Sequence, residues 1–171
     1  RLVRVIGTNL LSNPQLTGAG TAPNGWQSWT DSSHDPCTTV FAGTSGNSWT
    51  FWWEGGVYQD VTSGFSAGET VKFGGYLYTP LDDRLRNGTK YGVVQIEFYN
   101  STNGLISTVS AGPTISQTST NDVWVPVYGE TSVPAGATKI RYLIRCNDYA
   151  SGDGRFMVDD VYLRNGTRSG G

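Results

Sequence analysis

The chain has 171 residues, which is enough for one domain with a sizeable core. Its 12 basic and 14 acidic residues give a net charge of −2, which excludes the strongly positive surface that binds nucleic acid or an anionic membrane. No apolar run is long enough to span a bilayer. We therefore expect one monomeric domain over residues 1–171, ordered over about 8–165, with neither nucleic acid nor membrane as a partner.

Alternating runs rich in β-branched and aromatic residues follow one another along the chain, and helical periodicity is almost absent. The turn sequences SAGE, NSTNG, VPAGA and YASGDG separate these runs. The predicted strands are Trp49–Trp53, Val57–Val61, Thr70–Tyr78, Gly92–Tyr99, Leu105–Ser110, Trp124–Tyr128, Lys139–Asn147 and Phe156–Leu163. Many short strands at this spacing predict an all-β fold, a two-sheet antiparallel β-sandwich.

The stretch SWTFWWEGG contains three tryptophans, two of them adjacent. Neighbouring side chains of a strand point to opposite faces, so Trp52 and Trp53 cannot both enter one core. Trp49, Phe51 and Trp53 alternate on one face, whereas Trp52 and Glu54 lie on the other. One face therefore carries an exposed indole, and we expect Trp52 to be the more exposed of the adjacent pair, followed by Trp53.

Three of the predicted strands have one apolar and one polar face. In the strand at 139–147, for example, isoleucines alternate with arginines. The polar faces of the three strands carry Tyr76, Tyr78, Gln95, Glu97, Tyr99, Arg141, Arg145 and Asn147. If the strands share a sheet, its outer face holds the amides, charges and aromatic rings that bind sugar hydroxyls and sugar C–H faces. The alternative is a solvated face with an ordinary cross-strand ion pair of Glu97 with an arginine.

The chain has two cysteines, Cys37 and Cys146, and a single histidine, His34. A disulfide between the two distant cysteines would fit an exported protein, and two free thiols are the equal alternative. Two cysteines without a histidine cluster cannot form a zinc site. His34 stands in the polar run DSSHDP, where we expect a solvated loop.

The segment TPLDDRLRNGTKYG, residues 79–92, is longer than a tight turn and carries Arg84, Arg86 and Lys90. Long loops on a rigid sandwich often carry function. A basic loop beside a sugar site could receive the sulfate or carboxylate groups of an anionic polysaccharide. The alternative is a solvated loop whose charge is balanced by Asp82 and Asp83.

Three parts of the chain, spread from Asn9 to Leu163, are similar to a known family. The opening NLLSNPQLTG…NGWQSW, the middle GGVYQDVTSGFSAGETVKFGGYLYT and the close VPAGATKIRYLIRCND…GRFMVDDVYL resemble the corresponding parts of jelly-roll carbohydrate-binding modules of the broad family 4, 9, 16 and 22 type. The resemblance implies a two-sheet jelly-roll without catalytic activity. It also implies a secreted protein in which the module is joined to a glycoside hydrolase or polysaccharide lyase. The expected partner is a polysaccharide, either a neutral β-glucan, mannan or xylan or an anionic algal galactan.

The resemblance further implies a structural calcium ion near the first and last strands. The matching positions here are Asp159, Asp160 and Asn13, although the glutamate that the family carries after the Asn-Pro pair is missing from the segment 15–17. Calcium takes six to eight oxygen ligands, including backbone carbonyls. We expect Asp159 to be the main ligand, with Asn13 and Asp160 beside it.

The resemblance also assigns the remaining tryptophans. Trp26 and Trp124 match positions that are core in such modules, and Trp29 is a further candidate at the rim of the sugar site, with Trp52 and Trp53. Two other functions remain open at this stage. A small jelly-roll polysaccharide lyase could use Tyr99 as the base and Arg145 to neutralise charge, and a cell-surface adhesion sandwich would bind protein.

Overall fold

The computed structural model describes residues 7–29, 34–37, 41, 47–147 and 152–167. Its strands are β1 (Gln27–Trp29), β2 (His34–Cys37), β3 (Ser48–Phe51), β4 (Gly55–Val61), β5 (Thr70–Tyr78), β6 (Tyr91–Tyr99), β7 (Leu105–Ser110), β8 (Ile115–Ser116), β9 (Val125–Ser132), β10 (Lys139–Asn147) and β11 (Phe156–Asn165). All eight predicted strands are present, with ends that differ by a few residues. The described part of the chain contains no helix that could span a membrane.

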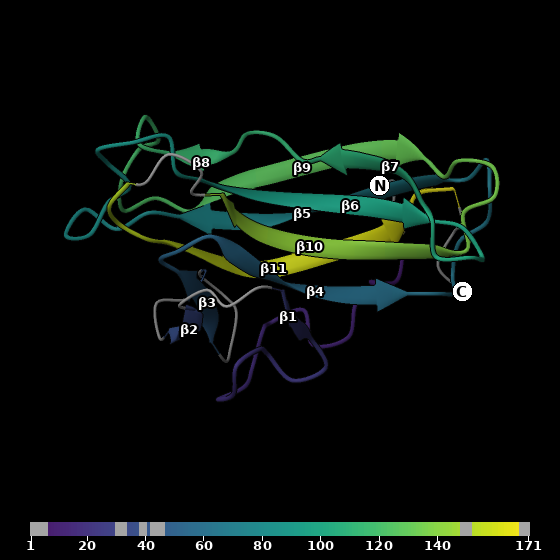
Figure 1. The fold of residues 1–171 in the computed structure, drawn as a ribbon, viewed down its shortest axis with the longest axis horizontal. Helices are drawn as coiled ribbons and strands as arrows, with labels where there is room; N and C mark the ends of the chain where they lie inside the picture. Colours follow the sequence, from purple (N-terminus) through teal and green to yellow (C-terminus); the bar gives the residue numbers. More distant parts are fainter. Residues whose placement is uncertain (1–6, 30–33, 38–40, 42–46, 148–151, 168–171) are drawn as a thin grey trace, which may run out of the picture.

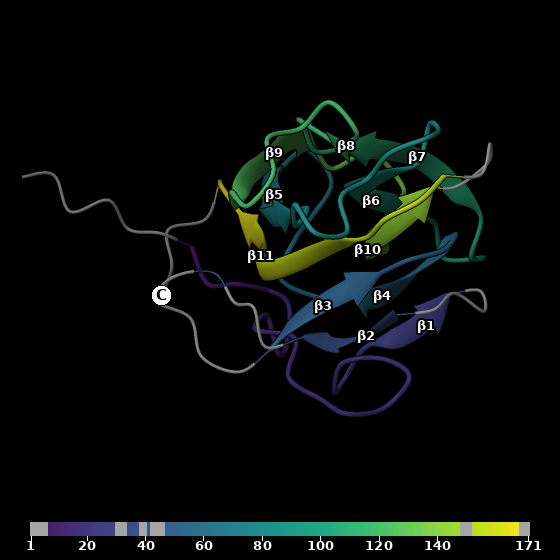
Figure 2. The same cartoon turned by 90° about the vertical axis from the view of Figure 1, so that its left-hand side faces the viewer.

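The strands form two antiparallel sheets that pack face to face (Figures 1 and 2). Sheet A has the order β2-β3-β11-β5-β9. Sheet B has the order β1-β4-β10-β6-β7, and β8 also pairs with β6. The predicted two-sheet β-sandwich is confirmed. The sheets join strands that are far apart in the sequence. In sheet B, for example, β10 lies between β4 and β6 and pairs with both.

Three short strands were not predicted. β1, β2 and β8 have three, four and two residues, which is too short for an alternating pattern to be recognised. Each becomes a strand because it pairs with a longer neighbour, as β1 does with β4. The backbone of His34 begins β2, so the expectation of a loop at this position is wrong.

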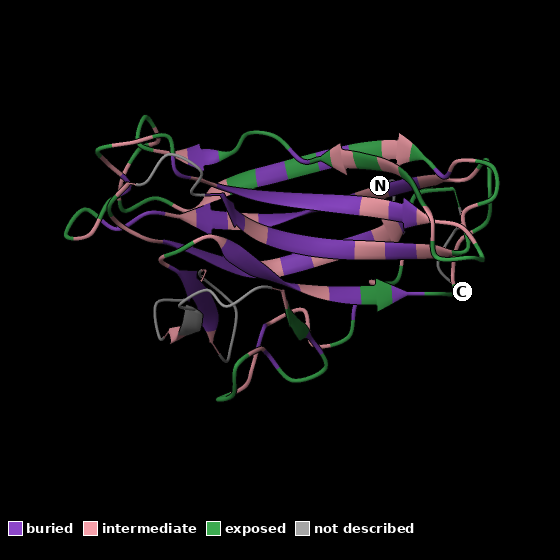
Figure 3. Cartoon of the chain, viewed as in Figure 1, coloured by how far each residue is buried: buried purple, intermediate pink, exposed green. Residues whose placement is uncertain are grey.

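The core lies between the sheets and follows the predicted alternation. Along β10, Ile140, Tyr142, Ile144 and Cys146 are buried in the core cluster, and along β6 the same holds for Val94, Ile96 and Phe98. Figure 3 shows these two strands mostly in purple, the colour of buried residues. The hydroxyl of Tyr142 crosses the core and donates to the Gly74 carbonyl of β5 at 2.6 Å, so a buried polar bond joins the two sheets.

The tryptophan-rich stretch leaves the strand earlier than predicted. β3 ends at Phe51, and both Trp49 and Phe51 are fully buried. The predicted alternation therefore does not continue to the adjacent pair, which lies in the connection to β4. Trp53 is 54% exposed and Trp52 is half-buried, so the predicted order of exposure is reversed.

Both cysteines are free thiols. Cys146 points from β10 into the core. Cys37 belongs to β2 of the other sheet, where its Sγ atom lies 3.5 Å from Sδ of Met157. Of the two alternatives that the sequence left open, the structure has the free thiols, with Cys37 only half-buried.

Candidate functional site

The outer face of sheet B is built from rows of residues that lie opposite one another on neighbouring strands. One row runs Trp29–Gly56–Arg145–Val93, the next runs Gln27–Tyr58–Leu143–Gln95–Ser110, and the third runs Asp60–Arg141–Glu97–Thr108. Residues directly opposite in an antiparallel pair share a face. Six predicted residues therefore meet on this face, as expected: Gln95, Glu97, Tyr99, Arg141, Arg145 and Asn147. Trp29 joins them from β1.

Trp29 and Arg145 form a stacked pair at one end of this face. The central guanidinium carbon of Arg145 lies 4.9 Å from the centroid of the Trp29 ring. A carboxylate oxygen of Glu54 lies 3.9 Å from the same guanidinium. A cation over an indole stabilises both side chains in one orientation. The pair presents a flat surface of the kind that stacks on the C–H face of a sugar ring.

Arg141 occupies the middle of the other half of the face. It makes two hydrogen bonds to Asp60, at 2.8 and 3.1 Å, and its guanidinium lies 4.0 Å from the ring centroid of Tyr58 and 5.3 Å from that of Tyr99. The hydrogen bonds to Asp60 raise the pKa of Arg141. The side chain is held between two aromatic rings by a forked ion pair, which is a rigid arrangement.

Tyr99 lies opposite Lys139 at the end of the pairing between β6 and β10. Nζ of Lys139 lies 4.5 Å from its ring centroid, and the same ammonium is 3.7 Å from Asp60. Partial burial, together with the negative charge of Glu97, raises the pKa of Tyr99. Its phenol therefore stays protonated at neutral pH and can donate a hydrogen bond.

A low floor lies between these taller side chains. Val93 and Leu143 are 4% and 5% exposed although both point away from the core, and Gln95 is 8% exposed. No hydrogen bond within the described residues engages the amide of Gln95. Asn147 closes the far side by donating to the hydroxyl of Tyr91 at 2.8 Å. The face thus combines an apolar floor with an amide that can donate and accept.

Tyr76 and Tyr78 do not belong to this face. They lie on β5 of sheet A, so the expectation that they share a sheet with Gln95 and Arg145 is wrong. Tyr76 stacks on Phe41 with 3.8 Å between ring centroids, and Tyr78 lies 5.0 Å from Trp124. Alternation along β5 was predicted correctly, but alternation within one strand does not show which sheet the strand joins.

Trp52 and Trp53 lie in the connection between β3 and β4, at an end of the sandwich. The buried ammonium of Lys90 donates to the Trp52 carbonyl at 2.5 Å and to the Gly154 carbonyl at 3.2 Å. It also lies 4.9 Å from the centroid of the Trp53 ring. The Trp52 ring lies instead beside Arg155, 5.8 Å from its guanidinium carbon. These two indoles are therefore fixed by cations and belong to the edge of the molecule rather than to the rows of sheet B.

The charges of the loop at 79–92 are largely neutralised. Lys90 is only 2% exposed, and Arg86 lies 3.6 Å from Asp83 and 4.0 Å from Asp153. Arg84 is exposed. The structure thus agrees with the balanced-loop alternative better than with a basic surface for sulfate groups.

The residues predicted for calcium do not form a common set of ligands. Both oxygens of Asp159 already accept backbone N–H groups, from Phe41 at 2.8 Å and from Asp160 at 2.7 Å. Oδ1 of Asp160 accepts from the amide of Gln15 at 2.8 Å. The side-chain oxygen of Asn13 faces Thr17, and within the described residues no three acidic, cysteine or histidine side chains gather as a metal group. Calcium binding stays a prediction.

Several residues of the face were missed, Tyr58, Asp60 and Lys139 among them. Tyr58 and Asp60 alternate with core residues in the predicted strand at 57–61, and this alternation would have identified them. Trp26 is buried, as expected, but Trp124 is only half-buried and contacts Tyr78 and Phe41, so its assignment to the core is wrong.

Comparisons with known proteins were made at three levels. No protein-family profile matches the chain, and no curated relative matches it. Among solved structures, the CBM22-1 xylan-binding domain of Paenibacillus barcinonensis Xyn10C is similar, with a TM-score of 0.63 and 17% identity over 95% of this chain and 97% of that one. The module TmCBM61, solved with β-1,4-galactotriose, has a TM-score of 0.57 and 15% identity over 92% of this chain and 99% of that one.

Larger proteins contain the same fold as a part. The active domain of tailspike protein 4 of bacteriophage CBA120 has a TM-score of 0.64 and 14% identity, and this chain covers 21% of it. The Clostridium thermocellum xylanase fragment Xyn10B, which joins CBM22-1 to a GH10 module, is covered over 28%. At these identities the likeness is one of fold. The chain has the jelly-roll fold of the carbohydrate-binding modules that its sequence resembles.

Proposed function

We propose that the chain is a non-catalytic carbohydrate-binding module that binds a polysaccharide along the outer face of sheet B. One observation carries the proposal. Adjacent rows of that face bring three aromatic rings, of Trp29, Tyr58 and Tyr99, together with the amide of Gln95 and two guanidinium groups that are already oriented. Rings stack on sugar C–H faces, and amides and guanidinium groups bind hydroxyls in pairs.

The length of the face favours the interior of a chain over a single sugar. From the row of Arg145 to the row of Lys139 and Tyr99 there are six residues of β10, or about 20 Å at the rise of a strand. A chain of several sugar units fits along this length. Similar domains bind such polymers: one is named as xylan-binding, and another was solved with a galactotriose.

A neutral polysaccharide suits the charges better than an anionic one. Arg141 and Lys139 both face Asp60, and Arg145 faces Glu54. An incoming sulfate or uronate group would compete with these carboxylates and would be repelled by them. Xylan, β-glucan, mannan and neutral galactan are therefore the preferred candidates, ahead of an anionic algal galactan.

The same arrangement disfavours catalysis. The lyase alternative requires Tyr99 and Arg145 at one reacting carbon, but they lie about 20 Å apart along the sheet. We further propose that the module is secreted as part of a longer protein. There it would hold a linked glycoside hydrolase or lyase near its polysaccharide and so raise the effective concentration of the substrate.

Affinity electrophoresis of the folded chain tests this proposal. The gels carry β-glucan, glucomannan, xylan, agarose, carrageenan or alginate, and Trp29→Ala runs beside the unaltered chain. The control is Tyr128→Ala, which removes an exposed aromatic ring from sheet A. We expect retardation by at least one neutral polysaccharide, strongly reduced in Trp29→Ala and kept in Tyr128→Ala. Retardation that is equal in the two variants would contradict the assignment of the face, and its absence from every gel would contradict the function.

A further inference from the structure

A pocket of about 450 Å³ opens on sheet A, on the side of the molecule opposite the face described above. It is lined by Tyr78, Pro80, Leu81, Asp82, Asp122, Arg155 and Met157. Tyr78 and Met157 lie opposite each other on β5 and β11. The segment after β5 and the residue before β11 supply the rest of the lining, except Asp122, which comes from the connection between β8 and β9. The volume falls within the range of roughly 300–1,000 Å³ that is usual for small-ligand sites.

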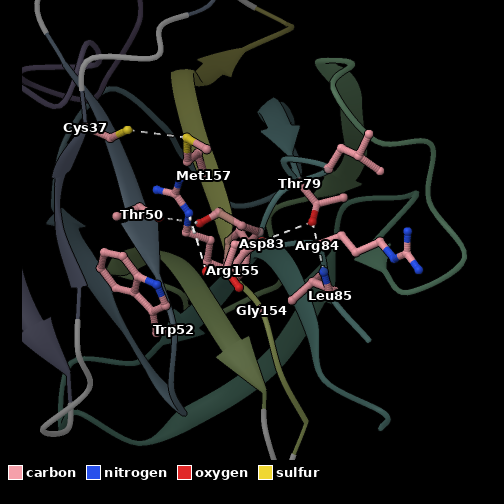
Figure 4. Close-up of polar contacts among 12 residues, drawn as sticks. Cys37, Thr50, Trp52, Thr79, Asp83, Arg84, Leu85, Gly154, Arg155 and Met157 are labelled. Carbon is pink, nitrogen blue, oxygen red and sulfur yellow. Dashed lines mark hydrogen bonds and ion pairs between the residues drawn. The ribbon is translucent and has the colours of Figure 1, made fainter. Parts of the chain in front are cut away.

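Arg155 is a fixed donor at the wall of this pocket. Figure 4 shows it between Trp52 and Asp83: its Nε atom is 3.7 Å from the Asp83 carboxylate, and its guanidinium carbon is 5.8 Å from the Trp52 centroid. Its backbone is also held, because its N–H donates to the Asp83 carbonyl at 3.0 Å and its carbonyl accepts from Thr79 at 3.0 Å. The guanidinium has five N–H donors, so this ion pair leaves several for a ligand in the pocket.

Asp122 is a fixed acceptor on the same pocket. Its Oδ1 atom accepts from the Tyr78 hydroxyl at 3.1 Å and from the Leu81 N–H at 3.0 Å. Burial, and then the bond to Asp122, raise the pKa of Tyr78, so this phenol keeps its proton at neutral pH. Within the described residues nothing donates to Oδ2 of Asp122. An oriented carboxylate with one engaged oxygen can accept a hydrogen bond from a hydroxyl without losing its own support.

An aromatic stripe continues from the pocket along the outer side of sheet A. The rings of Tyr78 and Trp124 are 5.0 Å apart, Trp124 meets Phe41 edge-on at 6.3 Å, and Phe41 stacks on Tyr76. Tyr78 and Trp124 are half-buried, so part of each ring is open to solvent. Rings of this kind provide the apolar contact that a sugar ring needs beside its polar groups.

The charged residues that line the pocket favour an uncharged ligand over an anionic one. Asp82 and Asp122 add two negative charges, and the single cation, Arg155, is already paired with Asp83. The local potential therefore disfavours uronates, sulfated sugars and phosphates. We propose that this pocket is a second carbohydrate-binding site, which takes a neutral pyranose unit through Asp122, Arg155 and the ring of Tyr78. The proposal does not depend on the face of sheet B. If both sites bind, the module engages glycan on two opposite sides and gains avidity without new contacts.

Titration of the ¹⁵N-labelled chain with xylohexaose, cellohexaose, mannohexaose and β-1,4-galactotriose, followed by NMR, tests the second site. We expect the amides of Leu81 and Asp122 and the indole N–H of Trp124 to shift along one binding curve. The indole N–H of Trp29 should follow its own curve for sheet B. If no probe shifts the three pocket signals, the proposal is wrong, whatever happens on sheet B. Shifts in the pocket with none on sheet B would support this site and contradict the proposed face.

Two variants connect the shifts to the pocket. Asp122→Asn keeps an oxygen that accepts from Tyr78 and Leu81, but it replaces the second, negatively charged oxygen with an amide that cannot accept a hydrogen bond from a sugar hydroxyl. We expect binding at this site alone to become about tenfold weaker, or about 1.4 kcal/mol. Leu81→Ser removes an apolar wall that is 55% exposed, which is not expected to affect folding. The neighbouring Val123→Ser, at a residue 47% exposed, is the matched control. If both pocket variants keep the affinity of the control, the assignment of the site is wrong.

Discussion

The guanidinium of Arg145 stacks over the indole of Trp29, although the strand β4 lies between the strands that carry them. The two residues can meet because Gly56 stands opposite both of them in the register and has no side chain to separate them. Neighbouring strands are about 4.8 Å apart, so two side chains separated by a third strand must reach across almost 10 Å. A single glycine therefore makes room for the stacked pair of the proposed sugar-binding face.

Gly56→Ala should destabilise the fold and disturb this pair. A Cβ atom at this position would lie 2.1 Å from the carbonyl oxygen of Ile144, which is backbone and cannot rotate away. We expect a loss of about 1–3 kcal/mol in the free energy of unfolding, as for other overpacked positions, measured by urea denaturation. Gly20→Ala is the control, because its nearest atom would be 3.9 Å away. Equal stability of the two variants would contradict the close approach of β4 and β10.

The strands were largely predictable from sequence because they are long and alternate. Along β10, core and outward-facing positions alternate, with Ile140, Tyr142, Ile144 and Cys146 in the core and both arginines on the outer face. The same regularity identified the polar faces of β5 and β6 individually. Strand pairing was not predictable, because it depends on contacts between segments far apart in the chain. Tyr76 and Tyr78 were therefore assigned to the wrong sheet.

The tryptophans show a second limit of sequence patterns. The run from Trp49 to Trp53 alternates as a strand would, yet β3 stops at Phe51 because the chain turns there toward β4. The turn is held by Lys90, which is distant in the sequence and becomes buried only in the folded protein. In the sequence, Lys90 looks like an ordinary lysine of a polar loop. The pattern therefore could not distinguish a buried lysine that holds a turn from part of a basic surface at 79–92.

Lys90→Met should loosen the turn that carries Trp52 and Trp53. The substitution keeps most of the apolar stem but removes the ammonium that binds the carbonyls of Trp52 and Gly154. Buried acceptors that lose a charged donor cost about 1–3 kcal/mol, and we expect a loss of this size in urea denaturation. The tryptophan fluorescence of the protein should change as well, because the Lys90 ammonium also lies 4.9 Å from the Trp53 ring. Arg84→Met, an exposed substitution in the same loop, should change neither quantity, and a similar effect of both variants would contradict the role of Lys90.

Calcium should have little effect on thermal stability. The oxygens of Asp159 already accept two backbone N–H groups, and those of Asn13 and Asp160 are also hydrogen-bonded, so these side chains are held in place without an ion. We expect the same Tm in calcium and in a chelator, measured by calorimetry. A Tm that rises with calcium in the unaltered chain but not in Asp159→Asn would contradict this expectation and support the ligand set that the family resemblance implies.

The hydroxyl that joins the two sheets should make the protein sensitive to alkaline pH. Burial raises the pKa of Tyr142 well above its ordinary value of about 10, and that of an unfolded chain stays near this value. The stabilisation is therefore complete below pH 10 and is lost as the pH rises from there toward the pKa of the folded state, because only the unfolded chain releases the proton.

We expect Tyr142→Phe to lose about 1 kcal/mol at neutral pH, from the bond to the Gly74 carbonyl. Above pH 10 the stability of the variant should fall less steeply, by about 1.4 kcal/mol per pH unit. Urea denaturation across this range measures both slopes. Parallel slopes for the unaltered chain and Tyr142→Phe would show that Tyr142 does not carry the alkaline sensitivity.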